Sequence, residues 1–358
     1  MQKVIQHCFI LLLFCQNFIF ADIHFNSIHN AKKVLKKSAK TLPSIVSSLV
    51  SIQLEAFPGA FNPSIFKTEE GFILTFRYLP EPVKEPWISF IGAVLLNETF
   101  EQISEPQLLN VRLNHHQALS QAEDARIFEH NKRIYVIYND NPDVTNTSIA
   151  DRRDIYMAEL FYSNQVFSLS IPIKLYHPKN YAAQLWEKNW SPFSWNNTLF
   201  LSYFLNPHEV LQANLESGCC EPVFSSNTSV SWKWGQLRGG TPAILVDGEY
   251  LAFFHSSKEM VSQGTKRKAM WHYFTGAYTY SPNPPFNLTK VSKRPIEEKS
   301  FYVKSPHPKR VIYPGGFVIS ENNIYLAFGK NDCEIWIATI DKNKLMNSLR
   351  AVGKNTHE

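Results

Sequence analysis

Cysteine is scarce in this sequence, and the cysteines that occur do not form a metal-binding pattern. Five are present among 358 residues, and neither a CxxC nor an HxxxH spacing occurs. Such spacings are typical of structural zinc sites, so we expect no zinc site and no other metal. Three of the five are Cys219, Cys220 and Cys333. Adjacent cysteines rarely bond to each other, so one disulfide from Cys333 to either of the other two is expected in an oxidising compartment.

An excess of charge of one sign is also absent. The formal net charge is +5, and basic residues are not interleaved with aromatic ones in the pattern typical of nucleic-acid-binding proteins. The densest basic segment, NAKKVLKKSAK at residues 30–40, is predicted to be a solvated part of a lead-in segment. We therefore expect no nucleic-acid partner.

Long hydrophobic runs are missing except at the N-terminus. The first 21 residues, MQKVIQHCFILLLFCQNFIFA, contain one charged residue, Lys3, and an apolar core of about 13 residues, whereas a membrane span needs about 20. Ala21 precedes Asp22, which favours a secretory signal peptide at residues 1–21 over an uncleaved signal anchor. The protein is therefore expected to be secreted, periplasmic or in the lumen of the secretory pathway, without stable membrane insertion once the signal is removed.

Sustained helical periodicity is absent too, and a repeated strand-and-turn pattern takes its place. Hydrophobic residues make up 44% and aromatic residues 14% of the chain, which excludes a disordered protein and suffices for a large core. Each repeat has a short apolar strand, a polar turn and a longer apolar-aromatic strand, as β-hairpins do. The repeats are FNPSIFKTEEGFILTFRY (61–78), DARIFEHNKRIYVIYND (124–140), WSPFSWNNTLFLSYF (190–204), GTPAILVDGEYLAFFHS (240–256) and PGGFVISENNIYLAFGK (314–330).

A third strand with an alanine at a fixed place follows each hairpin. The alanines are Ala93, Ala158, Ala213, Ala277 and Ala338. Five similar units predict a radial β-repeat. Strands such as RIYVIY and YLAFFH are apolar on both faces, as a sheet packed between two others requires. We therefore predict an all-β protein with a five-bladed β-propeller at residues 57–345, preceded by a lead-in segment at 22–56 and followed by a C-terminal tail at 346–358.

Polar residues stand at the start of the first strand of every predicted blade, where the strands of a propeller meet around its axis. They are Asn62, Asp124, Lys188 to Trp190, Arg238 to Thr241, and Tyr313 to Gly315. Because side chains two apart in a strand share a face, Asp124 and Arg126 are expected to point together while Glu123 points elsewhere. Three roles are open to Asp124: a catalytic acid, a substrate-orienting acceptor, or one half of a structural ion pair with Arg126.

Each predicted blade also carries a short motif of its own. The motifs are Asn62-Pro63-Ser64 with Arg77, Glu123-Asp124-Ala125-Arg126, Glu187-Lys188-Asn189, Gly239-Gly240-Thr241-Pro242 with Phe254-His255, and Pro314-Gly315-Gly316 with Phe328-Gly329-Lys330-Asn331-Asp332. In this order they resemble the motifs of the β-1,2-mannoside phosphorylases and β-1,2-mannosidases of glycoside hydrolase family 130, which are inverting enzymes with a five-bladed propeller. The resemblance covers all five predicted blades.

The resemblance implies roles for several side chains. It implies that Asp124 gives a proton to the departing sugar, directly or through a substrate hydroxyl, in a reaction on an oligosaccharide or glycan that needs no cofactor. It implies that the mannose is bound by Asn62, Arg77, Lys188, Asn189 and Asp332. Arg126, in the same predicted strand as Asp124, is assigned to the same task, because guanidinium groups, amides and carboxylates pair with sugar hydroxyls.

Two tryptophans near these motifs have two possible roles, and two other residues differ from the family pattern. Trp190 and Trp195 are candidates for apolar platforms under a sugar ring, or for ordinary core residues. Ala125 replaces the proline that follows the acid in the family. Lys330 replaces a small residue, and we expect it to intrude on the rim of the pocket.

The group that attacks the anomeric carbon decides the reaction, and the sequence leaves it open. A phosphorylase uses inorganic phosphate as co-substrate and needs cations, for which the candidates are Arg238, His255, Lys188, and Arg152 or Arg153. An inverting hydrolase needs a second carboxylate about 6.5–9.5 Å from the acid, for which the candidates are Glu123, Glu187 and Glu221. The predicted signal peptide favours hydrolysis, because phosphate-dependent salvage suits the inside of a cell. A β-mannosyltransferase and a secreted carbohydrate-binding propeller without catalysis are the alternatives.

Overall fold

The computed structural model describes residues 44–112, 119–141, 144, 152–179, 185–226, 228–261, 269–298, 301 and 309–353. The predicted signal peptide at 1–21, and the lead-in segment up to residue 43, lie outside the described residues. From Ile45 onward the chain forms one compact unit. No helix in the described ranges is long and apolar enough to cross a membrane.

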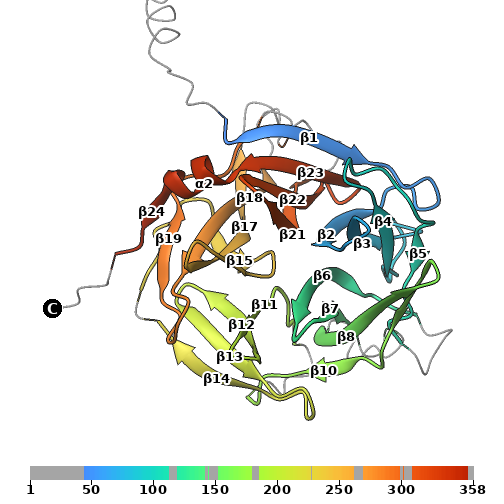
Figure 1. The fold of residues 1–358 in the computed structure, drawn as a ribbon, viewed down its shortest axis with the longest axis horizontal. Helices are drawn as coiled ribbons and strands as arrows, with labels where there is room; N and C mark the ends of the chain where they lie inside the picture. The colour runs from blue at the N-terminus through green and yellow to red at the C-terminus, as the bar shows by residue number, and fades with distance from the viewer. Residues whose placement is uncertain are drawn as a thin grey trace, which may run out of the picture. The chain divides into compact units, whose positions relative to one another are not determined.

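Five sheets stand around a common axis, so the prediction of an all-β, five-bladed propeller is confirmed (Figure 1). Their strands pair antiparallel except for β18 and β20, which are parallel. Blade one contains β2 (Phe61–Lys67), β3 (Phe72–Tyr78), β4 (Phe90–Leu96) and β5 (Gln107–Leu108). Blade two contains β6 (Glu123–His130), β7 (Arg133–Asp140), β8 (Asp154–Ser163), β9 (Val166–Leu169) and β10 (Ile173–Leu175). Blade three contains β11 (Ser191–Trp195), β12 (Thr198–Leu205), β13 (His208–Ala213) and β14 (Cys220–Ser225).

The last two blades are joined to the ends of the described chain. Blade four contains β15 (Gln236–Gly239), β16 (Ile244–Val246), β17 (Glu249–Val261), β18 (Ala269–Tyr280), β19 (Leu288–Ser292) and β20 (Lys309–Arg310). Blade five contains β21 (Ile312–Ser320), β22 (Asn323–Lys330) and β23 (Glu334–Asp341). Its outer strand is β1 (Val46–Ile52), which pairs with β23. After helix α2 (Lys342–Ser348), β24 (Leu349–Ala351) pairs with β19. The sheets therefore extend beyond the predicted bounds of 57 and 345 at both ends.

Apolar side chains fill the space between every two neighbouring blades. The described residues form five buried hydrophobic clusters, one at each interface. Between blades four and five, for example, the rings of Phe253 and Phe317 meet edge to face at 5.1 Å. All five of the repeated alanines are buried. This burial on both faces explains why the strands read as apolar throughout, since each sheet packs against two others.

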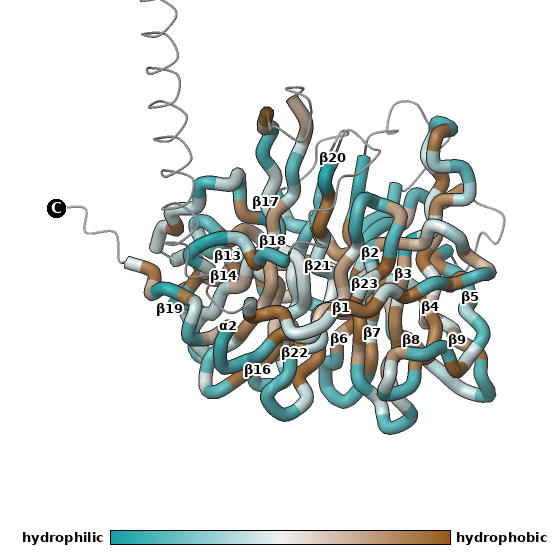
Figure 2. The backbone as a smooth tube through the Cα atoms, turned by 90° about the horizontal axis from the view of Figure 1, so that it is seen from above, coloured by the Kyte–Doolittle hydropathy of each residue, from teal (hydrophilic) through white to brown (hydrophobic). Residues whose placement is uncertain are grey.

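The short hairpin turns follow from residues that adopt positive φ angles. Asn131 and Lys132 connect β6 to β7 with φ angles of 50° and 62°, and Asn196 and Asn197 connect β11 to β12 with 47° and 60°. Two successive positive φ angles match the right-handed twist of paired strands, and asparagine tolerates them well. Figure 2, which views the disc from its edge, shows hydrophilic turns along one rim and hydrophobic strands above them.

The expected disulfide is not formed, and that prediction was wrong. Cys219, Cys220 and Cys333 are free thiols. The first two lie at the outer edge of blade three, whereas Cys333 lies in the turn between β22 and β23 of blade five, which is not a neighbour of blade three. Burial raises the pKa of the Cys220 thiol to about 12, so this side chain behaves as a small core residue.

Candidate active site

In three blades a residue close to the start of the inner strand adopts the left-handed backbone conformation. Asn62 has a φ of 47°, Asp124 of 57° and Asn189 of 66°. The register of β2 shifts after Phe61, and that of β6 shifts after Glu123, so two of these residues lie in β-bulges. Asparagine and aspartate tolerate this region better than other side chains, and a bulge changes the direction in which a side chain points. Strict alternation along the strand therefore fails at the start of β6.

The Asp124 carboxylate lies between blades one and two. Its Oδ1 atom accepts a hydrogen bond from Asn62 Nδ2 at 2.8 Å and lies 3.8 Å from Arg77 Nη1. The side chain keeps 13% of its surface exposed, so solvent reaches it. Both contacts involve the same oxygen, which orients the carboxylate without engaging Oδ2 in either of them.

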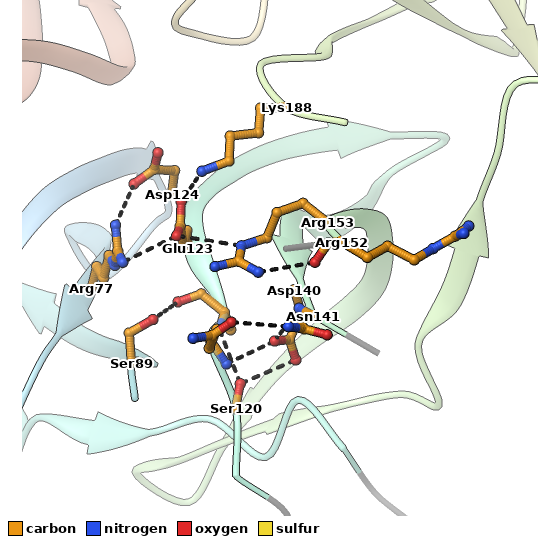
Figure 3. Close-up of polar contacts among 12 residues, drawn as sticks. Arg77, Ser89, Ser120, Glu123, Asp124, Asp140, Asn141, Arg152, Arg153 and Lys188 are labelled. Atoms are coloured by element: carbon orange, nitrogen blue, oxygen red, sulfur yellow. Dashed lines mark hydrogen bonds and ion pairs between the residues drawn. The ribbon is translucent and has the colours of Figure 1, made fainter. Parts of the chain in front are cut away.

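Glu123 lies beside Asp124 and is held by three cations (Figure 3). Its carboxylate is 2.8 Å from Lys188 Nζ, 3.2 Å from Arg77 Nη2 and 3.7 Å from Arg153 Nε. Burial alone would raise the pKa of Glu123, but Arg77, Lys188 and Arg153 together outweigh it and lower the pKa to about 2. We call Arg77, Glu123, Asp124, Arg153 and Lys188 the Glu123 cluster.

A close approach of two blades positions Asn62. Gly329, near the end of β22 in blade five, packs against the start of β2 in blade one. A Cβ atom at Gly329 would lie 2.1 Å from Asn62 Oδ1 and 2.6 Å from the Asn62 nitrogen. Only glycine allows this contact, so the residue at position 329 fixes how near the amide can come to the axis.

Arg126 does not pair with Asp124, and the expectation that the two point together was wrong. Its guanidinium donates to the carbonyl oxygen of Gly240, to Asn189 Oδ1 at 3.2 Å and to the Tyr313 hydroxyl at 2.5 Å. The side chain is buried. These neutral acceptors come from three other blade regions, so Arg126 ties blade two to blades three, four and five. The bulge at Asp124 is the physical reason, because it turns the acid away from the face of Arg126.

The other candidate cations differ in their charge and surroundings. Burial, with Arg126 and Arg238 nearby, lowers the pKa of His255 to about 3, so its imidazole is neutral at physiological pH. Arg238 is exposed and lies opposite His255 in the register of β15 and β17. Arg152 donates to both carboxylate oxygens of Asp154. Of these four candidates, Arg153 is the one that contacts Glu123.

The remaining candidate acids lie in separate environments. Glu187 is buried and accepts hydrogen bonds from Trp190 Nε1 at 2.9 Å and the Tyr203 hydroxyl at 3.1 Å. Glu221 lies in β14, the outermost strand of blade three, and accepts from Cys219 Sγ. Asp332 is exposed in the turn that follows β22. No group of His, Cys, Asp and Glu within the described ranges has the arrangement of a metal site.

Two expectations about nearby side chains are settled by burial. Lys330 is buried, with its Nζ atom 4.8 Å from the centre of the Trp336 ring and 3.8 Å from a Glu334 oxygen, so its charge is engaged within blade five. Trp190 is completely buried, and Trp195 packs against the cluster between blades three and four. Both tryptophans serve the core. The sequence predicted neither the place of Trp186 beside Arg153 and Lys188 nor the pairing of Arg153 with Glu123. These contacts join residues from different segments, so local spacing carries no signal of them.

Five sheets around one axis define the structural class of the chain, a five-bladed β-propeller (Figure 1). The family model described as β-1,4-mannooligosaccharide phosphorylase matches residues 40–351. The chain therefore belongs to glycoside hydrolase family 130, whose members are mannoside phosphorylases and glycoside hydrolases that act on β-mannosides. None of the curated proteins matches the sequence.

Solved structures of low sequence identity share the fold. A mannose phosphorylase from Leishmania mexicana, MPT-4, solved with a phosphate ion, is 13% identical, with a TM-score of 0.55 over 92% of this chain and 98% of its own. The β-1,2-mannobiose phosphorylase from Listeria innocua is 12% identical, with a TM-score of 0.55 over 86% and 94%. A family 130 structure from work on hydrolases that target β-1,2-mannosidic linkages in Candida mannan is 14% identical, with a TM-score of 0.58 over 83% and 87%.

Proposed function

We propose that this protein cleaves β-mannosides with inversion and that Asp124 delivers the proton to the departing sugar. One observation carries the proposal: a partly exposed carboxylate is oriented by Asn62 at the meeting point of two inner strands, beside a set of fixed cations. Both contacts of Asp124 use Oδ1, which makes Oδ2 the oxygen that would carry the proton. A positioned acid of this kind contributes roughly 10²- to 10⁴-fold to a reaction rate.

The proposed substrate-binding groups surround this acid. Arg77 and Lys188 belong to the Glu123 cluster, and Asn189 is held in place by Arg126. Cations and amides fixed by their own hydrogen bonds lose little freedom when they bind a sugar hydroxyl. We assign these residues, with Asn62, to the mannose whose bond is broken. Asp332 keeps the same proposed role, as an exposed carboxylate in the turn between β22 and β23 of blade five.

The charge of the Glu123 cluster favours phosphate as the attacking group. Three cations, Arg77, Arg153 and Lys188, face the two carboxylates of Glu123 and Asp124, so the formal charge of the cluster is three minus two, or +1. Glu123 itself is a very weak base, because its pKa is about 2. A site with surplus positive charge and no strong base attracts an anion and stabilises it as a nucleophile. The geometry therefore supports phosphorolysis, with Arg153 and Lys188 next to the phosphate.

Hydrolysis is the second candidate, and the predicted signal peptide is the observation that favours it. If the mature chain works in the secretory pathway or outside the cell, water is the more available nucleophile. Glu187 is then the proposed base, since it follows Trp186 and precedes Lys188 in the same segment. Its carboxylate accepts hydrogen bonds from Trp190 Nε1 and the Tyr203 hydroxyl, which hold it in a fixed position.

One experiment separates these reactions. The chain from Asp22 onward is incubated with β-1,2-mannobiose, with and without phosphate, and the sugars and sugar phosphates are identified by chromatography. Mannose 1-phosphate formed only with phosphate supports phosphorolysis, and free mannose formed without phosphate supports hydrolysis. Elongation of an acceptor from a sugar nucleotide or sugar phosphate, with no cleavage, points instead to a transferase. Binding without any reaction contradicts the proposal and indicates a carbohydrate-binding propeller.

A further inference from the structure

Trp186 is an exposed aromatic residue beside the Glu123 cluster, and the reaction described above gives it no role. It keeps 57% of its surface exposed, whereas Trp190, four residues further on, is completely buried. Trp87 and Trp271 are exposed to a similar degree, at 51% and 46%. Single exposed apolar residues are common on protein surfaces and need no function. What distinguishes Trp186 is the set of groups that hold it.

The backbone of Trp186 is fixed to the segment that brings Arg153 to the cluster. The Arg153 nitrogen donates to the carbonyl oxygen of Leu185 at 2.6 Å, and the Glu187 nitrogen donates to that of Arg153 at 3.0 Å. These two bonds form a parallel bridge between Arg153 and Trp186 outside the blade strands. A side chain on a backbone held in this way gives up little conformational entropy when a ligand packs on it.

Two cations of the cluster lie over the indole ring. Lys188 Nζ is 4.7 Å from the ring centroid and Arg153 Cζ is 5.6 Å from it. The same two side chains reach Glu123, at 2.8 and 3.7 Å. Trp186 and the Glu123 carboxylate therefore contact the same two cations.

We propose that Trp186 is a platform on which a sugar ring of the substrate stacks, next to the mannoside bond that Asp124 protonates. A β-linked mannopyranose carries the axial hydrogens of C1, C3 and C5 on one face and its axial 2-hydroxyl on the other. Only one face is apolar, and an aromatic ring buries that face while the hydroxyls around the edge stay free for polar partners. Trp186 thus sets which face of the sugar turns toward the protein. The inference rests on the proposed function and adds a specificity-determining residue to it.

The test measures binding in an Asp124→Asn background, so that no substrate is consumed. β-1,2-mannobiose and longer β-1,2-mannooligosaccharides are titrated while tryptophan fluorescence and the heat of binding are recorded. Trp186→Ala is expected to weaken binding about tenfold, the effect of losing a buried apolar contact of this size. It should also remove most of the change in fluorescence. Trp186→Phe, which keeps an aromatic face, should recover most of the affinity.

Trp271→Ala is the matched control, because this indole is similarly exposed but lies in blade four opposite Glu259. In the chain that retains Asp124, Trp186→Ala should raise KM with a smaller effect on kcat, a split that general loss of structure would not produce. Unchanged affinity in Trp186→Ala, or an equal loss in Trp271→Ala, overturns the platform and leaves the proposed function standing. If Trp186→Ala loses binding but the chain that retains Asp124 cleaves no mannoside, the result supports the platform and contradicts the proposed function.

Discussion

The ammonium group of Lys188, which precedes blade three, lies 2.8 Å from the carboxylate of Glu123, which begins blade two. Arg77 of blade one reaches the same carboxylate, so groups from three blades depend on one another's positions. Removing one partner of a buried ion pair strongly destabilises the folded protein, because the remaining charge stays buried without compensation. The arrangement makes the chemistry of the site depend on how the blades pack.

Glu123→Gln should reduce stability at neutral pH but have little effect in acid. The pKa of Glu123 is about 2 in the folded protein against 4.5 ordinarily, so its charge stabilises the fold above pH 4.5, and this contribution is lost as the pH falls toward 2. The shift corresponds to about 3 kcal/mol. Urea unfolding at several pH values checks this: the difference between the parent protein and Glu123→Gln should shrink by about that amount between pH 6 and pH 2. A difference that is independent of pH would contradict the assigned charge.

Asp124→Asn should abolish most of the activity without unfolding the protein. Asparagine can still accept the hydrogen bond from Asn62 Nδ2, but it cannot deliver a proton. We expect kcat to fall by roughly 10²- to 10⁴-fold while the melting temperature changes little. Steady-state kinetics on β-1,2-mannobiose and a thermal melt make the comparison. Retention of most of the activity would remove Asp124 from the role of acid.

Gly329→Ala should damage both stability and catalysis through Asn62. The new methyl group would overlap Asn62 atoms, including the backbone nitrogen, so the start of β2 must shift. Overpacking of this kind costs about 1–3 kcal/mol. The shift also moves the amide away from Asp124, so kcat should fall as well.

Gly353→Ala is the control for this change, because a Cβ at Gly353 meets no atom within 4 Å. Thermal unfolding and kinetics of the two variants should therefore differ. If Gly329→Ala behaves like Gly353→Ala, the contact with Asn62 is not what positions the acid.

His255 should stay neutral throughout the physiological pH range. Burial, followed by the charges of Arg126 and Arg238, lowers its pKa to about 3 from an ordinary 6.5. The folded state therefore binds fewer protons than the unfolded state between these values, and His255 makes the fold less stable as the pH falls from 6.5 toward 3. In an NMR titration from pH 8 to pH 5, the histidine signal that disappears in His255→Gln should not move. A shift of this signal between pH 8 and pH 5 would mean that His255 becomes charged there, and would make it again a candidate cation for binding phosphate.

The short strands, the polar turns and the repeated alanines were enough to predict the blades, because these signals are local. Turns with positive φ angles select asparagine and glycine within a few residues, and burial on both faces makes a whole strand apolar. The strands at the two ends of the described chain, β1 and β24, are harder to predict from the sequence. β1 and β24 add to sheets formed by distant parts of the chain, so their own residues do not reveal that they belong to a blade.

The candidate site was only partly predictable for a related reason. Asn62, Asp124 and Lys188 stand at strand starts that the repeat pattern identifies, and the family resemblance implies Arg77. The structure brings the four together. Strand alternation predicts that Asp124 and Arg126 point to the same face, and the bulge at Asp124 breaks that alternation. A single residue in the left-handed region is enough to reverse which side chains share a face.

The sequence by itself determined that this chain is a five-bladed propeller with acids, amides and cations at the starts of its inner strands, because hydrophobic periodicity and turn chemistry act over short distances. Only the tertiary structure decided which cations meet Glu123, which oxygen of Asp124 stays available, and that Trp186 rather than Trp190 is exposed. Those outcomes depend on distances between groups far apart in the chain. Electrostatic and packing energies are set by such distances, not by the order of residues.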